Sequence, residues 1–363
     1  MKKKIRAIAI HLPQFHPFAE NDEWWGKGFT EWTNVAKARP KFIGHYQPHI
    51  PSDTGFYDLR LPEARELQAK LAQENGIYGF CYYHYWFNGK ILMKKPLDDL
   101  LATNKPNFPF MYCWANENWT RVWDGGSSKI LIKQDYTIED DLLHIRYLLE
   151  NVFSDSRYIR IDGKPVFAIY RSTAFPNIKQ TIKLWREEAQ KYGIELYICR
   201  FESFNESGSA YLEDGFDAAI EFAPHNFLHK VKQYSPVKAL INKISNYIIN
   251  RRVCNLVVPY KKYVDFSAQI RYDSYKRYPC VTPRWDNSPR RKKGFFAFKN
   301  DTPLLYERCL SQVIDNFEPS SEQENFVFIN AWNEWAEGNH LEPDLKWGRK
   351  YLEATRNVLS NFC

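Results

Sequence analysis

Short apolar segments that alternate with helical stretches constrain the fold of this chain more than any other feature. Near-continuous apolar strands are buried on both faces, as in a parallel sheet that helices cover. Eight such strands predict a single (β/α)8 TIM-like barrel over residues 1–363, and an open doubly wound α/β sheet is the alternative. The eight segments end at His11, His84, Ala115, Arg171, Glu202, Ala223, Pro283 and Asn333.

Helix boundary signals stand between these segments. Pro62 opens a helical stretch that stops at Gly76, a second stretch closes on Gly193, and a third carries Pro303 in its first turn. Proline at the start of a helix and glycine just past its end are the expected asymmetry. No internal repeat or linker marks a second domain, so we expect one catalytic barrel domain.

Two connections are too long for a plain barrel. One follows the first strand, from about His11 to Leu61, and the other follows the sixth strand, at about 223–277. In barrels, the loops that follow the strands build the active-site face. We therefore expect the functional residues at the carboxyl ends of the strands.

The second long connection is basic. The chain carries a net charge of +7, and between Phe222 and Val264 it has no aspartate or glutamate. Such a segment suits an anionic partner, for example lipid head groups, a lipid pyrophosphate or an acidic polysaccharide. Eight cations lie in the segment: Lys230, Lys232, Lys238, Lys243, Arg251, Arg252, Lys261 and Lys262.

Within it, "VKALINKISNYIINRR" has apolar residues at helical spacing and cations elsewhere. This pattern predicts an ordinary surface helix packed on the barrel, and an amphipathic helix on a membrane surface is the alternative. A second basic stretch, "SPRRKKG" at 288–294, predicts a solvated loop, with a loop facing an anionic ligand as the alternative. The apolar positions are Val237, Leu240, Ile241, Ile244 and Ile248.

Aromatic residues make up 17% of the chain. Aromatic rings stack on sugar faces, while amides and acids hold sugar hydroxyls, although a large core also uses such bulk. On the second strand we assign the ligand role to His84 and Trp86. Structural alternatives are core histidines and, for Glu221, a buried ion pair. The expected carbohydrate-binding residues are His11, Gln14, His16, His84, Trp86, Trp114, Asn116, Glu117, Trp119, Glu221, Arg284, Trp285, Asn333 and Trp335.

Several chemistries lack their sequence motifs. The chain has no HExxH, no paired CxxC, no GxxxxGK[ST], no GxSxG, and no GxGxxG after the first strand. We therefore expect no metal and no cofactor, and a carbohydrate partner instead of a nucleic acid.

The cysteines and the first residues of the chain indicate the cellular compartment in which we expect the protein. Seven cysteines show no motif spacing, and Cys81, Cys113, Cys199 and Cys280 sit in apolar runs, as buried thiols of a reducing compartment do. The first residues lack a cleavable signal pattern, and no run of 18 apolar residues occurs. We expect a cytoplasmic protein, with peripheral contact to an anionic inner membrane.

The stretch "NAWNEWAEG", from Asn330 to Gly338, places Glu334 and Glu337 three residues apart at the end of the last strand. Cleavage of a glycosidic bond uses one protonated and one ionised carboxyl near the anomeric carbon. Neighbouring tryptophans lower the local polarity and help to separate the two pKa values. The pair predicts glycosidic acid–base chemistry, and surface acids beside an aromatic core are the alternative.

Several long blocks together resemble one known family. They are "HLPQFHPFAENDEWWGKGFTEWTNVAKARPKFIGHYQPHIPSDTGFYDL", "YGFCYYHYWFNGK", "PFMYCWANENWTRVWDG" and "NAWNEWAEGNHLEPD". The blocks resemble the WbsX-like family of polysaccharide-biosynthesis proteins over nearly the whole chain. That family is related to the endomannosidases of glycoside hydrolase family 99, and the likeness to these rests mainly on "NEWAEG" and the expected barrel.

The resemblance implies roles for the two glutamates. In the endomannosidases the motif is Asn-Glu-Trp-x-Glu-Gly, so Glu334 would deprotonate the sugar 2-hydroxyl, and Glu337 would protonate the leaving oxygen. Ala336 stands where those hydrolases have a larger polar residue, so different substrate contacts are expected there.

The resulting expectation is a retaining glycosyltransferase or transglycosidase of surface polysaccharide (O-antigen or capsule) biosynthesis. A retaining hydrolase of endomannosidase type is the first alternative. A non-catalytic carbohydrate-binding barrel is the second, although a binder has no need of two acids so spaced.

Overall fold

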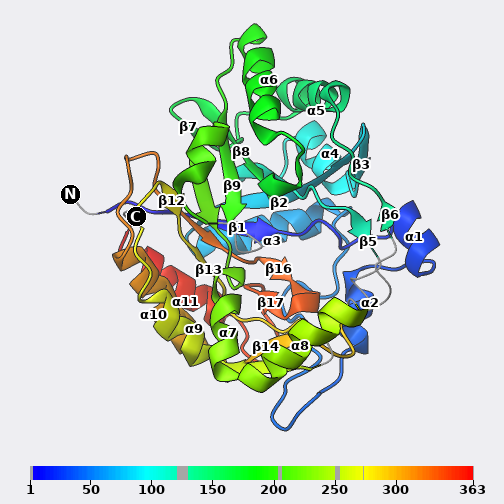
Figure 1. The fold of residues 1–363 in the computed structure, drawn as a ribbon, viewed down its shortest axis with the longest axis vertical. Helices are drawn as coiled ribbons and strands as arrows, with labels where there is room; N and C mark the ends of the chain where they lie inside the picture. The colour runs from blue at the N-terminus through cyan, green and yellow to red at the C-terminus, as the bar shows by residue number, and fades with distance from the viewer. Residues whose placement is uncertain (1–2, 121–129, 203–206, 250–253, 273, 363) are drawn as a thin grey trace.

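A computed structural model describes residues 3–120, 130–202, 207–249, 254–272 and 274–362. Its centre is a parallel sheet curled into a nearly closed barrel, which confirms the predicted fold class (Figure 1). In sheet order the strands are β12 (Arg277–Tyr278), β10 (Ala218–Glu221), β9 (Tyr197–Glu202), β8 (Lys164–Ile169), β4 (Phe110–Trp114), β2 (Ile77–Phe87), β1 (Arg6–His11), β15 (Phe326–Ile329) and β13 (Cys280–Val281).

The expected seventh strand is divided in two. β12 pairs with β10 on one side, and β13 pairs with β15 on the other. Pro279 lies between the two pieces and has no N–H to donate to a ladder, although its carbonyl accepts from the amide of Phe328 at 2.8 Å. The barrel therefore closes through two short pairings on either side of one proline.

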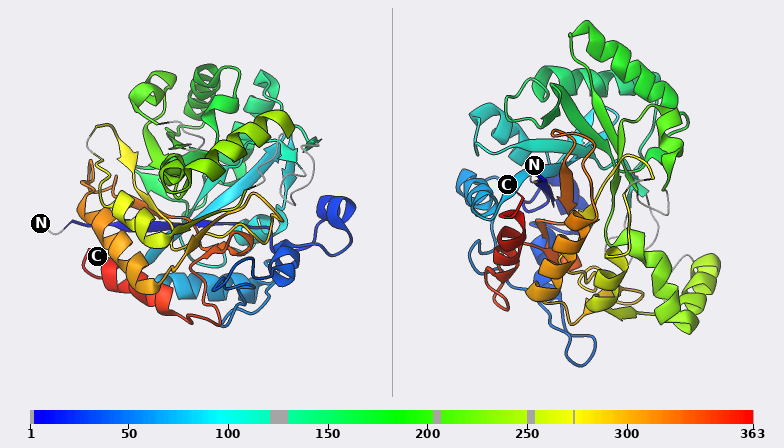
Figure 2. Two further views of the ribbon diagram at one scale, coloured as in Figure 1. Left: turned by 60° about the horizontal axis from the view of Figure 1, so that its bottom comes forward. Right: turned by 90° about the vertical axis from the view of Figure 1, so that its left-hand side faces the viewer.

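Helices cover the outside of the barrel (Figures 1 and 2). The boundary signals in the sequence are confirmed: Pro62 begins α3, Gly193 follows the end of α6, and Pro303 stands in the first turn of α10. The Thr302 side chain caps α10 by accepting from the amide of Leu305. The covering helices are α3 (Pro62–Glu74), α4 (Lys95–Thr103), α5 (Ile138–Asn151), α6 (Ile178–Lys191), α9 (Tyr260–Ser267), α10 (Pro303–Asp315) and α11 (Lys350–Leu359).

The two long connections carry structure of their own. The first holds α1 (Ala19–Trp25) and α2 (Glu31–Lys37). The second holds the short η4 turn (His225–Phe227), α7 (Leu228–Tyr234), α8 (Pro236–Ile249) and β11 (Leu256–Pro259) ahead of α9. β11 pairs in parallel with β14 (Phe296–Lys299), so the basic insertion is joined to the segment that follows the seventh strand.

Part of the aromatic excess fills the core. The largest fully buried side chains are tryptophans, tyrosines and a phenylalanine, among them Trp114, Trp185, Trp332 and Trp335. Burial of such rings contributes much of the stability of a core, because each removes a large apolar area from water. The remaining aromatic residues near the strand ends are available for a site.

The expected buried thiols are confirmed. Cys81, Cys113, Cys199 and Cys280 are all buried and unbridged. Across the described ranges, no helix combines the length and apolar character that crossing a bilayer requires.

Candidate active site

A cavity of about 470 Å³ opens at the carboxyl ends of the strands, within the size range of small-molecule sites. Side chains from the carboxyl-terminal half of β2 and from the segments that follow β4, β8, β10, β13 and β15 contribute to its wall, as a barrel site requires. Its polar and aromatic lining includes Tyr83, Tyr85, Glu117, Trp119, Tyr170, Arg171, His225, Trp285, Arg290, Arg291, Asn330, Glu334 and Glu337.

The chain reaches the two glutamates through a tight turn. After β15 it forms β16 (Asn333–Glu334), the 3-10 turn η5 (Trp335–Glu337) and β17 (Asn339–His340), and β16 pairs with β17. Gly338 joins η5 to β17 with φ +55°, and a Cβ there would lie 3.0 Å from Cβ of Asp286. The Asp286 amide donates to the Glu337 carbonyl at 2.6 Å. Glycine at this position therefore lets the turn hold Glu337 against the loop after the seventh strand.

One guanidinium joins both glutamates to a third. Arg290 donates from Nη2 to Glu31 at 2.9 Å and to Glu334 at 3.0 Å. Its Nη1 lies 2.8 Å from the Glu337 carboxylate. The side chains of Arg290, Glu31 and Glu334 are 5%, 2% and 7% exposed, and that of Glu337 is 21% exposed on the cavity side. The alternative of surface acids is therefore wrong.

Three carboxyls contact the Arg290 guanidinium, and Arg291 also acts on Glu337, so the carboxyls outnumber the cations that set the protonation of the site. Burial raises the pKa of Glu334 to about 8; Arg290 lowers that pKa, and the charges of Glu337 and Glu31 raise it. Burial likewise raises the pKa of Glu337 above its usual value, against the lowering effect of Arg290. Near neutral pH the pair Glu334/Glu337 therefore retains a proton and a negative charge together, the state that acid–base catalysis needs.

A buried acid behind the pair fixes the tryptophans of the motif. Glu342 accepts hydrogen bonds from Trp335 Nε1 at 2.6 Å, Gln68 Nε2 at 2.7 Å, Tyr57 Oη at 2.8 Å and Trp332 Nε1 at 3.1 Å. Burial raises the pKa of Glu342 to about 7, and the four donors act in the opposite direction. The network locks Trp335, which stands between the two candidate catalytic residues in sequence.

Three of the expected binding residues line the cavity. Glu117 forms an ion pair with Arg171 at 2.7 Å, and burial raises the pKa of Glu117. The ring of Trp119 meets that of Tyr85 edge-on at 5.3 Å. Trp285 is 6% exposed, and its buried indole N–H has no hydrogen-bond partner among the described residues. A sugar hydroxyl is a suitable acceptor for it.

On β2, the side chains that face the cavity are the neighbours of the ones we expected. Tyr83 and Tyr85 line the cavity, whereas His84 and Trp86 point toward α5. His84 Nε2 lies 3.1 Å from a ring nitrogen of His144, and the Trp86 indole donates to Asp140 at 3.0 Å. Successive side chains on a strand face opposite sides, so the assignment of one pair decides the other. The expected roles of His84 and Trp86 as ligands are therefore not supported.

The remaining expected ligands hold the scaffold outside the cavity wall. His11 contacts Gln68 at 3.1 Å, and burial lowers the pKa of His11 to about 3. The Asn333 side chain bonds both backbone groups of Leu12, which ties the last strand to the first. Buried polar groups need such partners. Glu221, Arg284, Asn116 and Trp335 also bond within the protein, and Gln14, His16 and Trp114 are buried away from the wall. Asn116 in addition lines a second cleft beside the cavity.

Two central residues were absent from the expected site. Glu31 lies in "GFTEWTN", where one glutamate beside a tryptophan carries no motif signal by itself. Arg290 lies in "SPRRKKG", which we expected to be solvated; the structure instead buries Arg290 against three carboxylates. Because four consecutive cations stand in this stretch, the sequence does not indicate which of them is buried.

A second, polar cleft of about 790 Å³ adjoins the cavity and shares Glu117, Asn118 and Arg171 with it. Four acids and two cations line the cleft, so its net charge is 2 − 4 = −2 with all six ionised. The side-chain oxygen of Gln134 is buried in this wall without a partner among the described residues. The cleft therefore suits a neutral, hydroxyl-rich group better than an anion.

Comparison with known proteins identifies the family. Residues 7–355 match the family described as "Glycosyltransferase WbsX". The chain belongs to the WbsX glycosyltransferase family. The protein WxcX of Xanthomonas campestris pv. campestris is 38% identical over 355 residues, or 97% of this chain and 49% of WxcX, so the chain spans about half of that relative's length.

Solved structures of glycoside hydrolases share the fold of this WbsX family protein. The GH99 endo-α-mannosidase from Bacteroides thetaiotaomicron matches with a TM-score of 0.58 at 12% identity, over 98% of this chain and 97% of that one. A glycoside hydrolase-like protein also matches with a TM-score of 0.58 at 12% identity, over 98% and 94%. The sequence comparison shows the family, and the solved structures show the fold.

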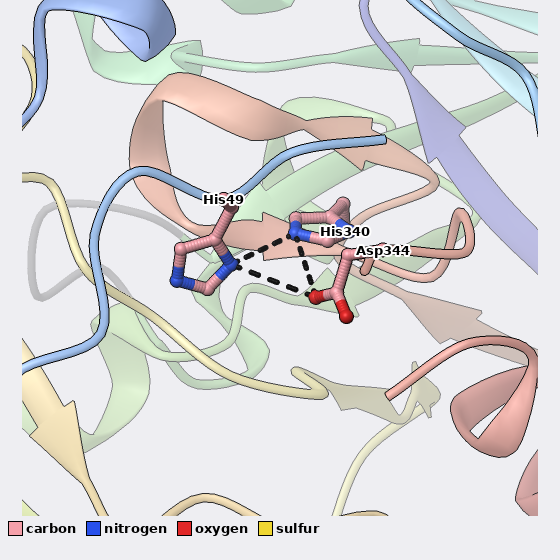
Figure 3. Close-up of side chains that lie close together, drawn as sticks. All are labelled: His49, His340 and Asp344. Carbon is pink, nitrogen blue, oxygen red and sulfur yellow. Dashed lines mark hydrogen bonds and ion pairs between the residues drawn. The ribbon is translucent and has the colours of Figure 1, made fainter. Parts of the chain in front are cut away.

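One buried group in this WbsX family protein has the residue types of a metal site (Figure 3). The nearest ligand atoms of His49, His340 and Asp344 lie within 4.8 Å of one another. However, Arg284 Nη1 lies 2.6 Å from the Asp344 carboxylate and 3.4 Å from His49 Nδ1. The guanidinium already supplies the cation of this group, so the residues fit an arginine-centred network better than a metal.

Chelation tests this conclusion. Dialysis against EDTA is expected to leave both the melting temperature and the activity unchanged, because Arg284 stays in place without any ion. Parallel thermal scans and rate assays before and after dialysis make the comparison. A fall in melting temperature that zinc or another divalent ion restores would contradict the arginine-centred reading.

Proposed function

We propose that this protein is a retaining glycosyltransferase or transglycosidase that builds a surface polysaccharide such as O-antigen or capsule. The observation that carries the proposal is the pair Glu334 and Glu337, both bonded to Arg290 in a cavity lined by aromatic rings. Membership of the WbsX family supports transfer, and the likeness to endo-α-mannosidases supports a barrel that works on glycosidic bonds.

In the proposed first step, Glu334 removes the proton of the 2-hydroxyl, whose oxygen attacks the anomeric carbon as the bond to the leaving oxygen breaks. Glu337 gives its proton to that leaving oxygen. In the second step an acceptor hydroxyl attacks the same carbon and gives its proton to Glu337, while O2 regains its proton from Glu334. Two inversions give net retention. With a pKa of about 8, Glu334 itself holds the shared proton for most of the time near neutral pH, so the scheme starts from the less populated arrangement of the coupled pair, in which the proton lies on Glu337. In that arrangement the Glu334 carboxylate is a stronger base than an ordinary one.

The pH dependence of kcat/KM follows from this scheme. The active pair carries one proton, so activity is expected to fall about tenfold per pH unit above about 8, where the pair loses its proton. Activity is also expected to fall at acid pH, below the raised pKa of Glu337, because both carboxyls are then protonated. Rates measured from about pH 5 to about pH 10 give the profile. A flat profile across this range argues against a shared proton.

We propose that the polar cleft holds further sugar residues of the glycan. It continues from the cavity past Glu117 and Arg171, and its negative balance disfavours a pyrophosphate there. The unpartnered oxygen of Gln134 and the indole N–H of Trp285 would each gain a hydroxyl partner. The glycan would then run from the cavity toward α5.

We also propose a cytoplasmic location at the inner membrane, where a lipid-linked glycan is presented. The free thiols support a reducing compartment.

Hydrolysis remains the second candidate function, because water and a sugar hydroxyl compete for the same intermediate. Incubation with glycans and lipid-linked acceptors in ¹⁸O-labelled water separates the two. Transfer yields an extended glycan without the label, whereas hydrolysis yields a reducing sugar that carries it. Binding of the glycan without either product would favour a non-catalytic barrel and overturn the proposed function.

A further inference from the structure

The helix α8 presents large apolar side chains to solvent. Val237 is 70% exposed, Ile248 is 70% exposed and Tyr247 is 92% exposed. Leu240, Ile241 and Ile244 are 58%, 41% and 50% exposed. Single exposed apolar residues are ordinary, but a contiguous set on one helix marks an interaction surface. Figure 2 shows α7 and α8, in yellow-green, standing out from the barrel at the lower right of the right-hand view.

The apolar residues share one side of the helix. At about 100° per residue, positions 237, 240, 241, 244, 247 and 248 fall within an arc of about 120°. Asn242, 5% exposed, lies on the opposite side. Its side chain bonds both backbone groups of Cys254 at 2.8 Å and so anchors the helix. The apolar side of α8 therefore faces away from the protein.

Cations flank this side. By the same helical geometry, Lys238 and Lys243 lie on either edge of the apolar arc, and both are exposed. On α7, Tyr234 is 41% exposed, and Nζ of Lys262 lies 5.5 Å from the centre of its ring. No acid occurs between Phe222 and Val264, and the first one that follows, Asp265, pairs with Lys261 at 2.8 Å.

We propose that α8 is a membrane-docking helix that lies in the head-group region of a bilayer rich in anionic lipids. Its apolar side enters the boundary between head groups and acyl chains, and Lys238 and Lys243 contact lipid phosphates. Each cation near such a surface strengthens binding by about fivefold, and the effect falls with salt. An interfacial helix combines an apolar arc with flanking cations in this manner. The surface lies outside the cavity and the cleft, so the contact is separate from the glycosidic chemistry.

The test is co-sedimentation of the full chain with vesicles of phosphatidylglycerol and phosphatidylcholine, and with vesicles of phosphatidylcholine alone. Strong binding is expected only to the anionic vesicles, with weakening at high salt. The double variant Ile244→Ser/Ile248→Ser is expected to bind about a hundredfold less tightly or weaker still, since each isoleucine contributes about tenfold or more through burial. Lys238→Glu/Lys243→Glu should bind the anionic vesicles weakly, and the binding that remains should no longer weaken as salt is added.

A matched control is available on other surfaces. Ile43 is 104% exposed and Leu304 is 76% exposed, so Ile43→Ser/Leu304→Ser removes the same kind of area elsewhere and should leave vesicle binding unchanged. All variants should keep their activity on a water-soluble glycan, which separates loss of docking from loss of catalysis. Absence of vesicle binding, or equal loss in the control, overturns the proposal. So does a dimer in light scattering that Ile244→Ser/Ile248→Ser dissociates, because the occupant is then a second copy.

Discussion

Glu337→Gln is expected to lower kcat/KM on unactivated glycans by about 10²- to 10⁴-fold, the usual contribution of general acid–base catalysis. The amide keeps the size of the side chain but has no proton to give to the leaving oxygen. Steady-state rates on a natural glycan measure the loss. Unchanged turnover would remove the acid role from Glu337.

Two comparisons sharpen this prediction. Glu353→Gln makes the same chemical change at an exposed position of α11 and should leave the rate unchanged. A glycan with an activated aryl leaving group needs little protonation, so it should restore much of the rate to Glu337→Gln. It should not restore the rate to Glu334→Gln, because the base is then absent. The reverse pattern would exchange the two roles.

Arg290→Met is expected to abolish activity and to lower the free energy of unfolding by about 3–5 kcal/mol, because it leaves buried carboxylates without their cation. Arg290 is 5% exposed and holds Glu31, Glu334 and Glu337. Without it, the pKa values of Glu334 and Glu337 should rise further, so the variant should recover stability relative to wild type as the pH falls. Urea unfolding at acid and alkaline pH measures the difference.

Lys293→Met supplies the matched control for Arg290→Met. It removes a cation from the same loop at an exposed position and should change stability little. The double variant Arg290→Met/Glu31→Gln should lose less stability than the sum of the single changes, since one unpaired charge disappears. Full additivity would contradict direct coupling between Arg290 and Glu31.

The barrel could be predicted from sequence because strand burial and helix boundaries are local signals. Pro62 and Pro303 mark helix starts by their own chemistry, and the structure places the starts of α3 and α10 there. The phase of β2 could not be predicted in this way. Both faces of that strand are aromatic and buried, so the alternation that separates Tyr83 from His84 carries no polarity signal.

The candidate site was predictable only in part, for a similar reason. Glu334 and Glu337 stand in one short motif, so local sequence is enough to find them. Arg290 is 259 residues from Glu31 and 44 residues from Glu334, so folding alone brings them together. Arg290 differs from the exposed cations beside it only in its partners, which are distant in the sequence. Local composition therefore does not distinguish it.

The central claim is that Glu334 and Glu337 make or break a glycosidic bond. The most direct measurement is a mass-spectrometric time course of glycan and acceptor with wild type and with Glu337→Gln. We expect wild type to change the glycan by whole sugar residues, and the variant to be slower by about 10²-fold or more. Equal product formation by both proteins, or no product from wild type while the glycan binds, would contradict the claim.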